Sequence, residues 1–89
     1  MIKVMENKTL IKIEGQDNNV AEVIETLEAG KSLFFLGSTT KYVGVELYGL
    51  TDNPRWFGAD IHLTGDTVSQ KQLDLFRIEF PNVNAEVAE

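Results

Sequence analysis

The sequence contains no cysteine among its 89 residues, and this absence excludes several kinds of protein. A disulfide-stabilised scaffold, a thiolate metal site and a cysteine nucleophile all need that residue. Histidine and tryptophan occur once each, as His62 and Trp56. Folding therefore depends on the packing of apolar side chains, which make up 43% of the chain and are numerous enough for a globular core.

The sequence also lacks long apolar runs and is poor in basic residues. No segment approaches the ~20 apolar residues of a transmembrane helix, and the first ten residues do not follow the pattern of a signal peptide. We therefore expect a cytoplasmic protein without membrane contact. Eight Lys and Arg stand against fourteen Asp and Glu, which gives a net charge of −6. Because nucleic-acid affinity depends on neutralising phosphates with basic side chains, we expect no direct binding to nucleic acid.

Alternating and helical spacings of the apolar residues predict one small α+β domain over residues 1–81, followed by a short tail at 82–89. The predicted order is β-β-α-β-β-β-α, a mostly antiparallel sheet with two helices. The expected strands are a hairpin over residues 2–14 that turns at Glu6-Asn7-Lys8, a buried strand at 32–36, and a second hairpin formed by 41–48 and 56–64. The tail is expected either to dock as a turn or to fray.

The first helix is predicted over Val20–Ala29, because the apolar residues at 20, 23, 24 and 27 form one stripe. Asn19 is its expected N-cap, with Glu22 in the capping-box position. Gly30 is the expected left-handed residue after the last turn.

The second helix is predicted over Val68–Glu79, with Thr67 or Ser69 as its N-cap. Its large apolar residues fall on one face of a helix at spacings of three and four. The last of them also alternate as they would in a strand, so periodicity alone leaves this segment open between helix and strand.

Acidic residues are concentrated in one stretch of the sequence. Between Ile13 and Gly30 there are five acids and no base: Glu14, Asp17, Glu22, Glu25 and Glu28. The last three are spaced by three along the predicted helix, opposite its apolar stripe, without a Lys at i+4 to neutralise them. Two interpretations fit. The charges keep the protein soluble, or they bind a basic partner protein, including one whose nucleic-acid groove this protein would occupy by mimicry.

The second candidate surface is one face of the hairpin over 41–64. If Tyr48 faces Trp56, antiparallel pairing places Glu46 opposite Gly58. That face would carry six side chains suited to holding a small ligand. They are Tyr42, Glu46, Tyr48, Trp56, Asp60 and His62. The alternatives are that the second helix covers this face, or that the aromatic side chains only shield the sheet.

Neither a catalytic set nor a metal site can be assembled from these residues. His62 is the only histidine, no serine lies in a G-x-S-x-G or S-x-x-K setting, and His62 with Asp60 and Glu46 matches no known ligand spacing. We therefore predict a protein that is not an enzyme and holds no metal or cofactor. The leading hypothesis is a small regulatory or inhibitory protein that presents its acidic helix to a basic partner. The alternative is a ligand-binding module, and both are compatible with a homo-oligomer.

Overall fold

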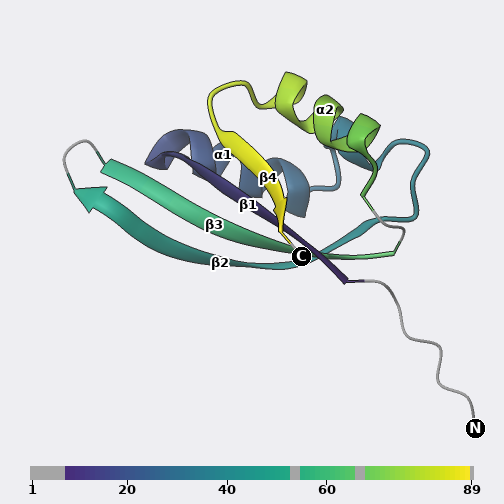
Figure 1. Ribbon diagram of the computed structural model, residues 1–89, viewed down its shortest axis with the longest axis horizontal. Helices are drawn as coiled ribbons and strands as arrows, with labels where there is room; N and C mark the ends of the chain where they lie inside the picture. The colour runs from purple at the N-terminus through teal and green to yellow at the C-terminus, as the bar shows by residue number, and fades with distance from the viewer. Residues whose placement is uncertain (1–7, 53–54, 66–67, 89) are drawn as a thin grey trace, which may run out of the picture.

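The computed structural model describes residues 8–52, 55–65 and 68–88 (Figure 1). Within these residues four strands, two α-helices and one short 3-10 helix, η1, follow one another. Their bounds are β1 Lys8–Gln16, α1 Asp17–Glu28, η1 Leu33–Phe35, β2 Lys41–Asp52, β3 Arg55–Thr64, α2 Gln70–Glu79 and β4 Asn84–Ala88. The predicted α+β class is confirmed, whereas several of the predicted elements differ.

The four strands form one antiparallel sheet in the order β2-β3-β1-β4. β1 and β3 pair continuously from Lys8↔Thr64 to Gln16↔Trp56 and hold the two central positions, so β2 and β4 are the edges. α1 connects β1 to β2, and α2 connects β3 to β4. This is the split β-α-β arrangement of ferredoxin-like folds, a framework that supports many unrelated functions.

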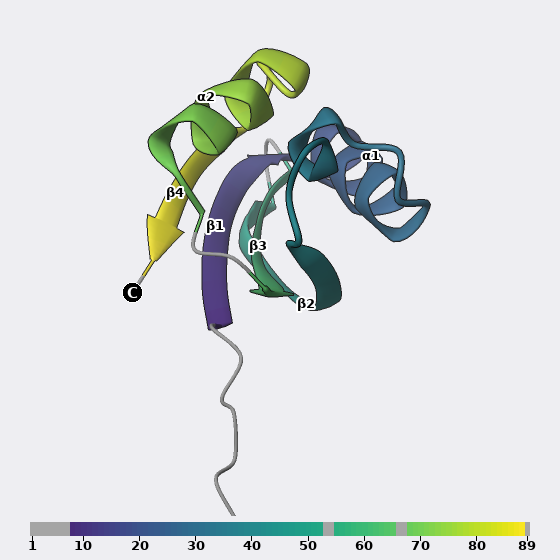
Figure 2. The same ribbon diagram turned by 90° about the vertical axis from the view of Figure 1, so that its right-hand side faces the viewer.

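The core lies between one face of the sheet and both helices, as Figure 2 shows. Alternate residues of the central strands, such as Ile11 and Ile61, are 0% exposed and pack against the apolar sides of α1 and α2. Phe76 of α2 is also 0% exposed, with its ring centroid 5.8 Å from that of Phe34 and 5.0 Å from that of Phe80. We call this side of the sheet the helix-side face and the other side the open face.

β1 includes a residue that we assigned to a turn. Lys8 is the first residue of the strand, and along Leu10–Glu14 the strand is paired on both sides, with β3 and with β4. Leu10–Glu14 therefore cannot also pair with a third strand, as the predicted hairpin requires. The other half of the predicted hairpin, at residues 2–5, lies outside the described residues.

α1 confirms the predicted apolar stripe and corrects the predicted start. The residues at 20, 23, 24 and 27 are all buried, and Gly30 follows the last turn with a φ of +68°. The helix begins at Asp17, however, so the N-cap is Gln16 and not Asn19. The polar residues that we interpreted as a loop are tolerated in the first turn, whose N–H groups lack helical partners. The Asp17 carboxylate accepts one such bond from the N–H of Asn18 at 2.7 Å.

Residues 32–36 contain a turn of 3-10 helix instead of the buried strand that we predicted. Phe34 is 1% exposed, whereas Leu33 is 47% exposed. The hydroxyl of Ser32 accepts from the N–H of Phe34 at 3.2 Å and donates to the Glu79 carboxylate at 2.6 Å. That carboxylate also accepts from the N–H of Leu33 at 3.1 Å. The N–H groups of Leu33 and Phe34 thus bind side chains, those of the next two residues donate to carbonyl oxygens within the turn, and no neighbouring strand is needed for these donors.

The hairpin of β2 and β3 is confirmed, but its register differs by two residues from the predicted one. Tyr48 pairs with Gly58 and not with Trp56, and β2 continues to Asp52 through residues that we expected in a loop. An irregularity of the pairing interrupts β2 near each of its ends. Each adds a residue on one strand, which a simple alternation cannot anticipate.

Periodicity left this segment open between helix and strand, and the structure shows that it is a helix, α2. Its N-cap is Ser69, whose hydroxyl accepts from the N–H of Gln72 at 3.2 Å, while the Gln72 side chain accepts from the N–H of Ser69 at 3.0 Å. Of the two predicted N-caps, Ser69 is therefore confirmed, and together with Gln72 it forms a capping box.

The segment after Pro81 is part of the sheet, where we expected a docked turn or a frayed tail. β4 pairs with β1 from Leu10↔Ala88 to Glu14↔Asn84. The guanidinium of Arg77 on α2 donates two hydrogen bonds to the carbonyl oxygen of Ala85, at 2.8 and 3.1 Å. Helix and edge strand are thereby joined by a charge-assisted contact.

Candidate functional site

Among the residues that the structure describes, no helix covers the open face of the sheet, because α1 and α2 both pack on the other side (Figure 2). The idea that the second helix covers this face is therefore wrong. Side chains that alternate with the core residues line it, including Asp60 and His62 of β3 and their cross-strand neighbours on β2, Glu46 and Gly44.

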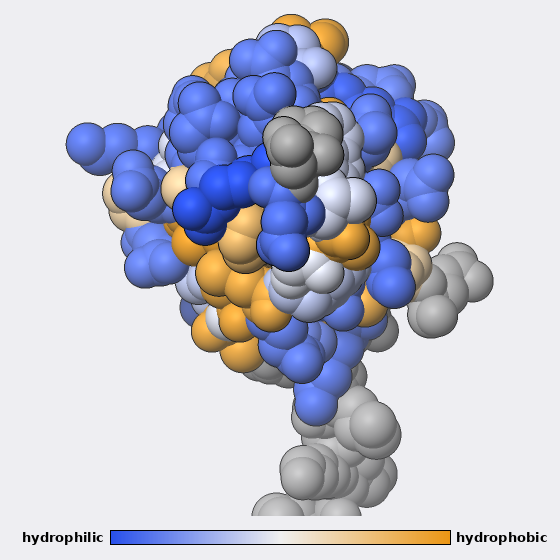
Figure 3. All heavy atoms as spheres, turned by 90° about the vertical axis from the view of Figure 1, so that its left-hand side faces the viewer, coloured by the Kyte–Doolittle hydropathy of each residue, from blue (hydrophilic) through white to orange (hydrophobic). Residues whose placement is uncertain are grey.

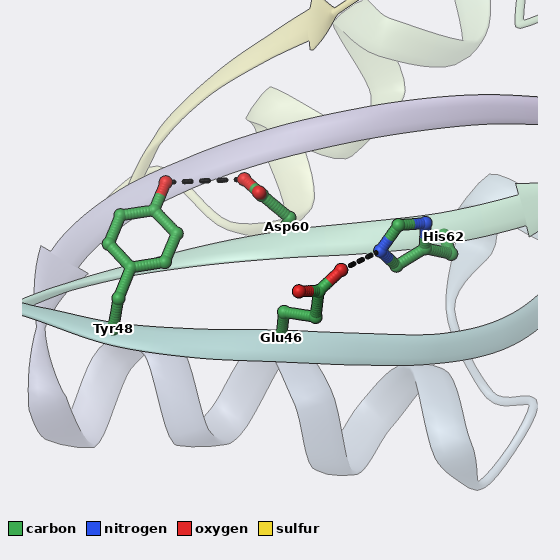
Figure 4. A network of polar contacts seen from close by, with 4 residues as sticks. All are labelled: Glu46, Tyr48, Asp60 and His62. Carbon is green, nitrogen blue, oxygen red and sulfur yellow. Dashed lines mark hydrogen bonds and ion pairs between the residues drawn. The ribbon is translucent and has the colours of Figure 1, made fainter.

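Two polar pairs join β2 and β3 on the open face, and Figure 4 shows them side by side. The Tyr48 hydroxyl donates to an Asp60 carboxylate oxygen at 3.2 Å. Nε2 of His62 lies 2.8 Å from a carboxylate oxygen of Glu46. Gly58 leaves space for the Tyr48 ring, since a Cβ atom at this position would collide with it. Four of the six predicted ligand-binding residues are thus brought together, and they bind one another.

The electrostatic surroundings of Tyr48 are acidic. Partial burial raises the pKa of its phenol above the ordinary value, and the hydrogen bond to the Asp60 carboxylate together with the negative charges of Asp60 and Glu14 raises this pKa further. The phenol therefore stays protonated and donates to Asp60 at neutral pH.

Tyr42 does not belong to this surface, which corrects our prediction. It pairs with Leu63, and its side chain packs against the core on the helix-side face. The pairing irregularity between Tyr42 and Gly44 reverses the alternation of β2 at this point. Burial raises the pKa of Tyr42, and the negative charge of Glu28 on α1 adds to this effect.

Trp56 lies farther along the hairpin than predicted. It pairs with Thr51 on one side and with Gln16 on the other, and it is partly buried. Trp56 lies two positions from Gly58 on β3, so both residues belong to the same face of the sheet. Because the register is shifted by two residues, Tyr48 pairs with Gly58 and not with Trp56. The six predicted residues therefore do not form one continuous surface.

The five acidic residues of the predicted partner surface are also divided. Glu14 is exposed on the open face, where it pairs with Gly58 across the sheet. Asp17 forms an ion pair with Arg55 of β3, with 3.1 Å between Oδ2 and Nε. Glu22, Glu25 and Glu28 remain together on α1, and all three are exposed.

The three α1 glutamates form a diagonal row across the outside of the helix. A step of three residues falls about 60° short of a full helical turn, so the row winds from one flank of α1 to the other. Glu22 borders a small hollow beside Phe80 at the end of α2, and Glu28 borders another hollow together with Tyr42 of β2. None of the three makes an ion pair with a residue of the described ranges 8–52, 55–65 and 68–88.

Several polar contacts that organise these surfaces were not predicted. Arg55 of the hairpin forms an ion pair at the start of α1, Glu79 accepts a hydrogen bond from the residue before η1, and Arg77 donates to a carbonyl oxygen of β4. In the first two cases the partners are 38 and 47 positions apart (55 − 17 and 79 − 32). No local pattern links residues so distant, so the sequence offers no signal for these contacts.

Two kinds of feature are absent from the part of the chain that the structure describes. There, no three His, Cys, Asp or Glu side chains come close enough together to hold a metal ion, and no helix among these residues has the length and apolar character to cross a membrane.

Comparisons with known proteins add no relative to this description. No protein-family model matches the sequence, and a search of curated protein sequences also gives no match.

Proposed function

We propose that this protein is an interaction protein that binds a basic partner through the outer surface of α1. The observation that carries the proposal is the charge of this helix, which has four acids and no base, so that its formal charge is −4. One acid, Asp17, is engaged by Arg55, and the other three are exposed without an ion pair among the described residues. We refer to Glu22, Glu25 and Glu28 together as the acidic row.

Like charges on neighbouring turns destabilise a helix by a few tenths of a kcal/mol per pair. The last of them, Glu28, also lies at the C-terminal end, where a carboxylate interacts unfavourably with the helix dipole. The acidic row therefore does not stabilise the fold. Its presence is accounted for if it attracts a positively charged surface, since such fields steer association and favour the matching partner.

The proposal is tested by titrating a labelled oligo-arginine peptide against two variants that remove equal charge. The first, E22Q/E25Q/E28Q, removes the acidic row. The second removes three exposed acids elsewhere and is E14Q/D74N/E86Q. We expect the first variant to bind more weakly, with a shallower dependence on salt, and to be no less stable than the wild type. Equal weakening in both variants would mean that only net charge matters, and would contradict the proposal.

The mimicry hypothesis is a finer version of the same proposal. If the basic surface of the partner is a nucleic-acid groove, duplex DNA should compete with this protein for the partner once the partner is known. Binding that persists in the presence of saturating DNA would separate the two sites.

A small-ligand site on the open face has less support. Tyr42 lies on the other face, Trp56 is shifted along the hairpin, and the remaining polar groups are already paired with one another. A ligand would have to replace those contacts, and desolvating them lowers the net gain in binding energy.

A further inference from the structure

A second feature of the described residues is the long edge of the sheet. β2 runs from Lys41 to Asp52, twelve residues, and among the described strands it pairs with β3 alone. The opposite edge, β4, has five residues. An edge strand presents a row of N–H and C=O groups that can pair with another chain, so β2 offers by far the longer template.

The regular part of this edge lies between its two pairing irregularities. From Gly44 to Gly49 each residue opposes one residue of β3 without interruption. Leu47 stands in the middle of this stretch on the helix-side face and is 56% exposed, because α1 lies mainly over the central strands. Figure 3, viewed from the hairpin end, shows hydrophobic residues gathered beside the tip. An exposed apolar residue on a long edge favours the addition of a strand.

The charges beside Gly44–Gly49 select the kind of chain that fits there. The side chain of Glu46 is 73% exposed on the open face. On the helix-side face Glu28 of the acidic row borders the same hollow as Tyr42 of this strand, and its charge acts on Tyr42. An acid thus lies on each face of the edge, and a second copy of this chain that placed these acids together would bring like charges into contact, which is destabilising.

We propose that an extended segment of the basic partner adds to the sheet as a fifth strand along Gly44–Gly49. Its main chain would pair with β2, an apolar side chain would cover Leu47, and Lys or Arg side chains would approach Glu46 and Glu28. This inference rests on the proposed function, because it assigns the conformation of the basic segment that the acidic row attracts. Main-chain bonds supply affinity in such strand addition, and alternate side chains supply specificity.

The test uses a synthetic extended peptide with Arg on both faces and one central Val to oppose Leu47, and a second peptide of the same sequence with alternate backbone amides N-methylated. The methyl groups leave charge and apolarity nearly unchanged but remove main-chain donors. We expect the methylated peptide to bind about tenfold more weakly, since each lost hydrogen bond is worth roughly a kcal/mol. Amide exchange within Gly44–Gly49 should slow when the unmethylated peptide binds.

A pair of protein variants with matched charge provides the control. Leu47→Lys places a repelling charge on the edge, whereas Ile78→Lys places the same charge on α2 at a side chain that is 73% exposed. We expect weaker peptide binding for Leu47→Lys only, with circular dichroism confirming that both variants fold. The methylated peptide tests the idea on the wild-type protein if Leu47→Lys does not fold.

The outcomes separate this inference from the proposed function. If the E22Q/E25Q/E28Q variant loses binding while methylation has no effect, the acidic row binds the peptide and the fifth strand is wrong. If methylation weakens binding and the triple variant does not, the edge binds and the acidic row does not contribute. A protein that dimerises through β2 at micromolar concentration, with the peptide excluded, would also overturn the inference.

Discussion

The two helices lie on the same face of the sheet, yet they use their polar side chains in different ways. α2 carries two bases and two acids, so its formal charge is zero, whereas α1 carries four acids and no base. On α2 the polar groups make internal contacts. Arg77 binds the Ala85 carbonyl, Glu79 holds Ser32, and Ser69 forms the capping box.

On α1 the N-cap residue Gln16 makes no side-chain capping bond, and the acidic row makes no ion pair with any residue that the structure describes. Arg77, Glu79 and Ser69 are thus engaged by the fold, so their substitution should lower stability. The acidic row makes no such contact among the described residues, so under the proposed function its substitution should weaken binding and leave stability nearly unchanged. Each of the following predictions tests one part of this division.

The largest effect is expected in the anchor of α2. Phe76→Ala should lower the free energy of unfolding by about 3–5 kcal/mol, because it leaves a cavity beside the rings of Phe34 and Phe80. Urea denaturation followed by circular dichroism measures this. Glu25→Ala on the outer side of α1 should change stability by less than about 0.5 kcal/mol. Comparable losses in the two variants would refute the division between the helices.

A smaller difference is expected at the two helix starts. Ser69→Ala should cost about 1 kcal/mol, since it removes a capping box. Gln16→Ala should cost less than about 0.5 kcal/mol, because the Gln16 side chain makes no cap bond. The same denaturation experiment measures both variants, and a larger loss at Gln16 than at Ser69 would reverse the comparison.

The smallest effect concerns the charge of Glu28. Burial and the Glu28 carboxylate both raise the pKa of Tyr42, so the folded protein holds this phenol proton to higher pH than the unfolded chain. The stability that Tyr42 contributes in this way is present below its ordinary pKa of about 10 and is lost as the pH rises through the raised value.

Glu28→Gln should therefore lower the pKa of Tyr42, though not to its ordinary value, because burial is the larger cause. Ultraviolet absorbance of tyrosinate measures this, with Tyr48→Phe as the common background so that one tyrosine titrates. Glu22→Gln, on the other flank of α1, is the matched control. An unchanged titration in the Glu28 variant would show that this acid does not act on the sheet edge.

Local signals in the sequence predicted local structure well. The apolar stripe of α1, the cap at Ser69 and the alternation of residues 56–64 all depend on residues within a few positions of one another, and the structure confirms each. A helix stripe or a capping box is visible in sequence because its members meet within one or two turns.

Three of the failures have a different physical origin. β4 is a strand because β1 offers a free side to it, and β1 lies about seventy positions earlier in the chain. Tyr42 changes face because of one irregularity in strand pairing, which composition does not reveal. The candidate surface on the open face was displaced for the same reason, whereas the acidic row, which depends on helical spacing alone, lies on one helix as predicted.

The position of β1 has a consequence for how the protein is made. β1 is the first of the described strands to be synthesised, and it lies inside the sheet between β3 and β4. One side of β1 pairs with residues 55–64 of β3, and the other side pairs with residues 84–88 of β4. A nascent chain can pair β1 with β3 before β4 has left the ribosome, so the β4 side of β1 stays open to wrong pairings for longer than the β3 side.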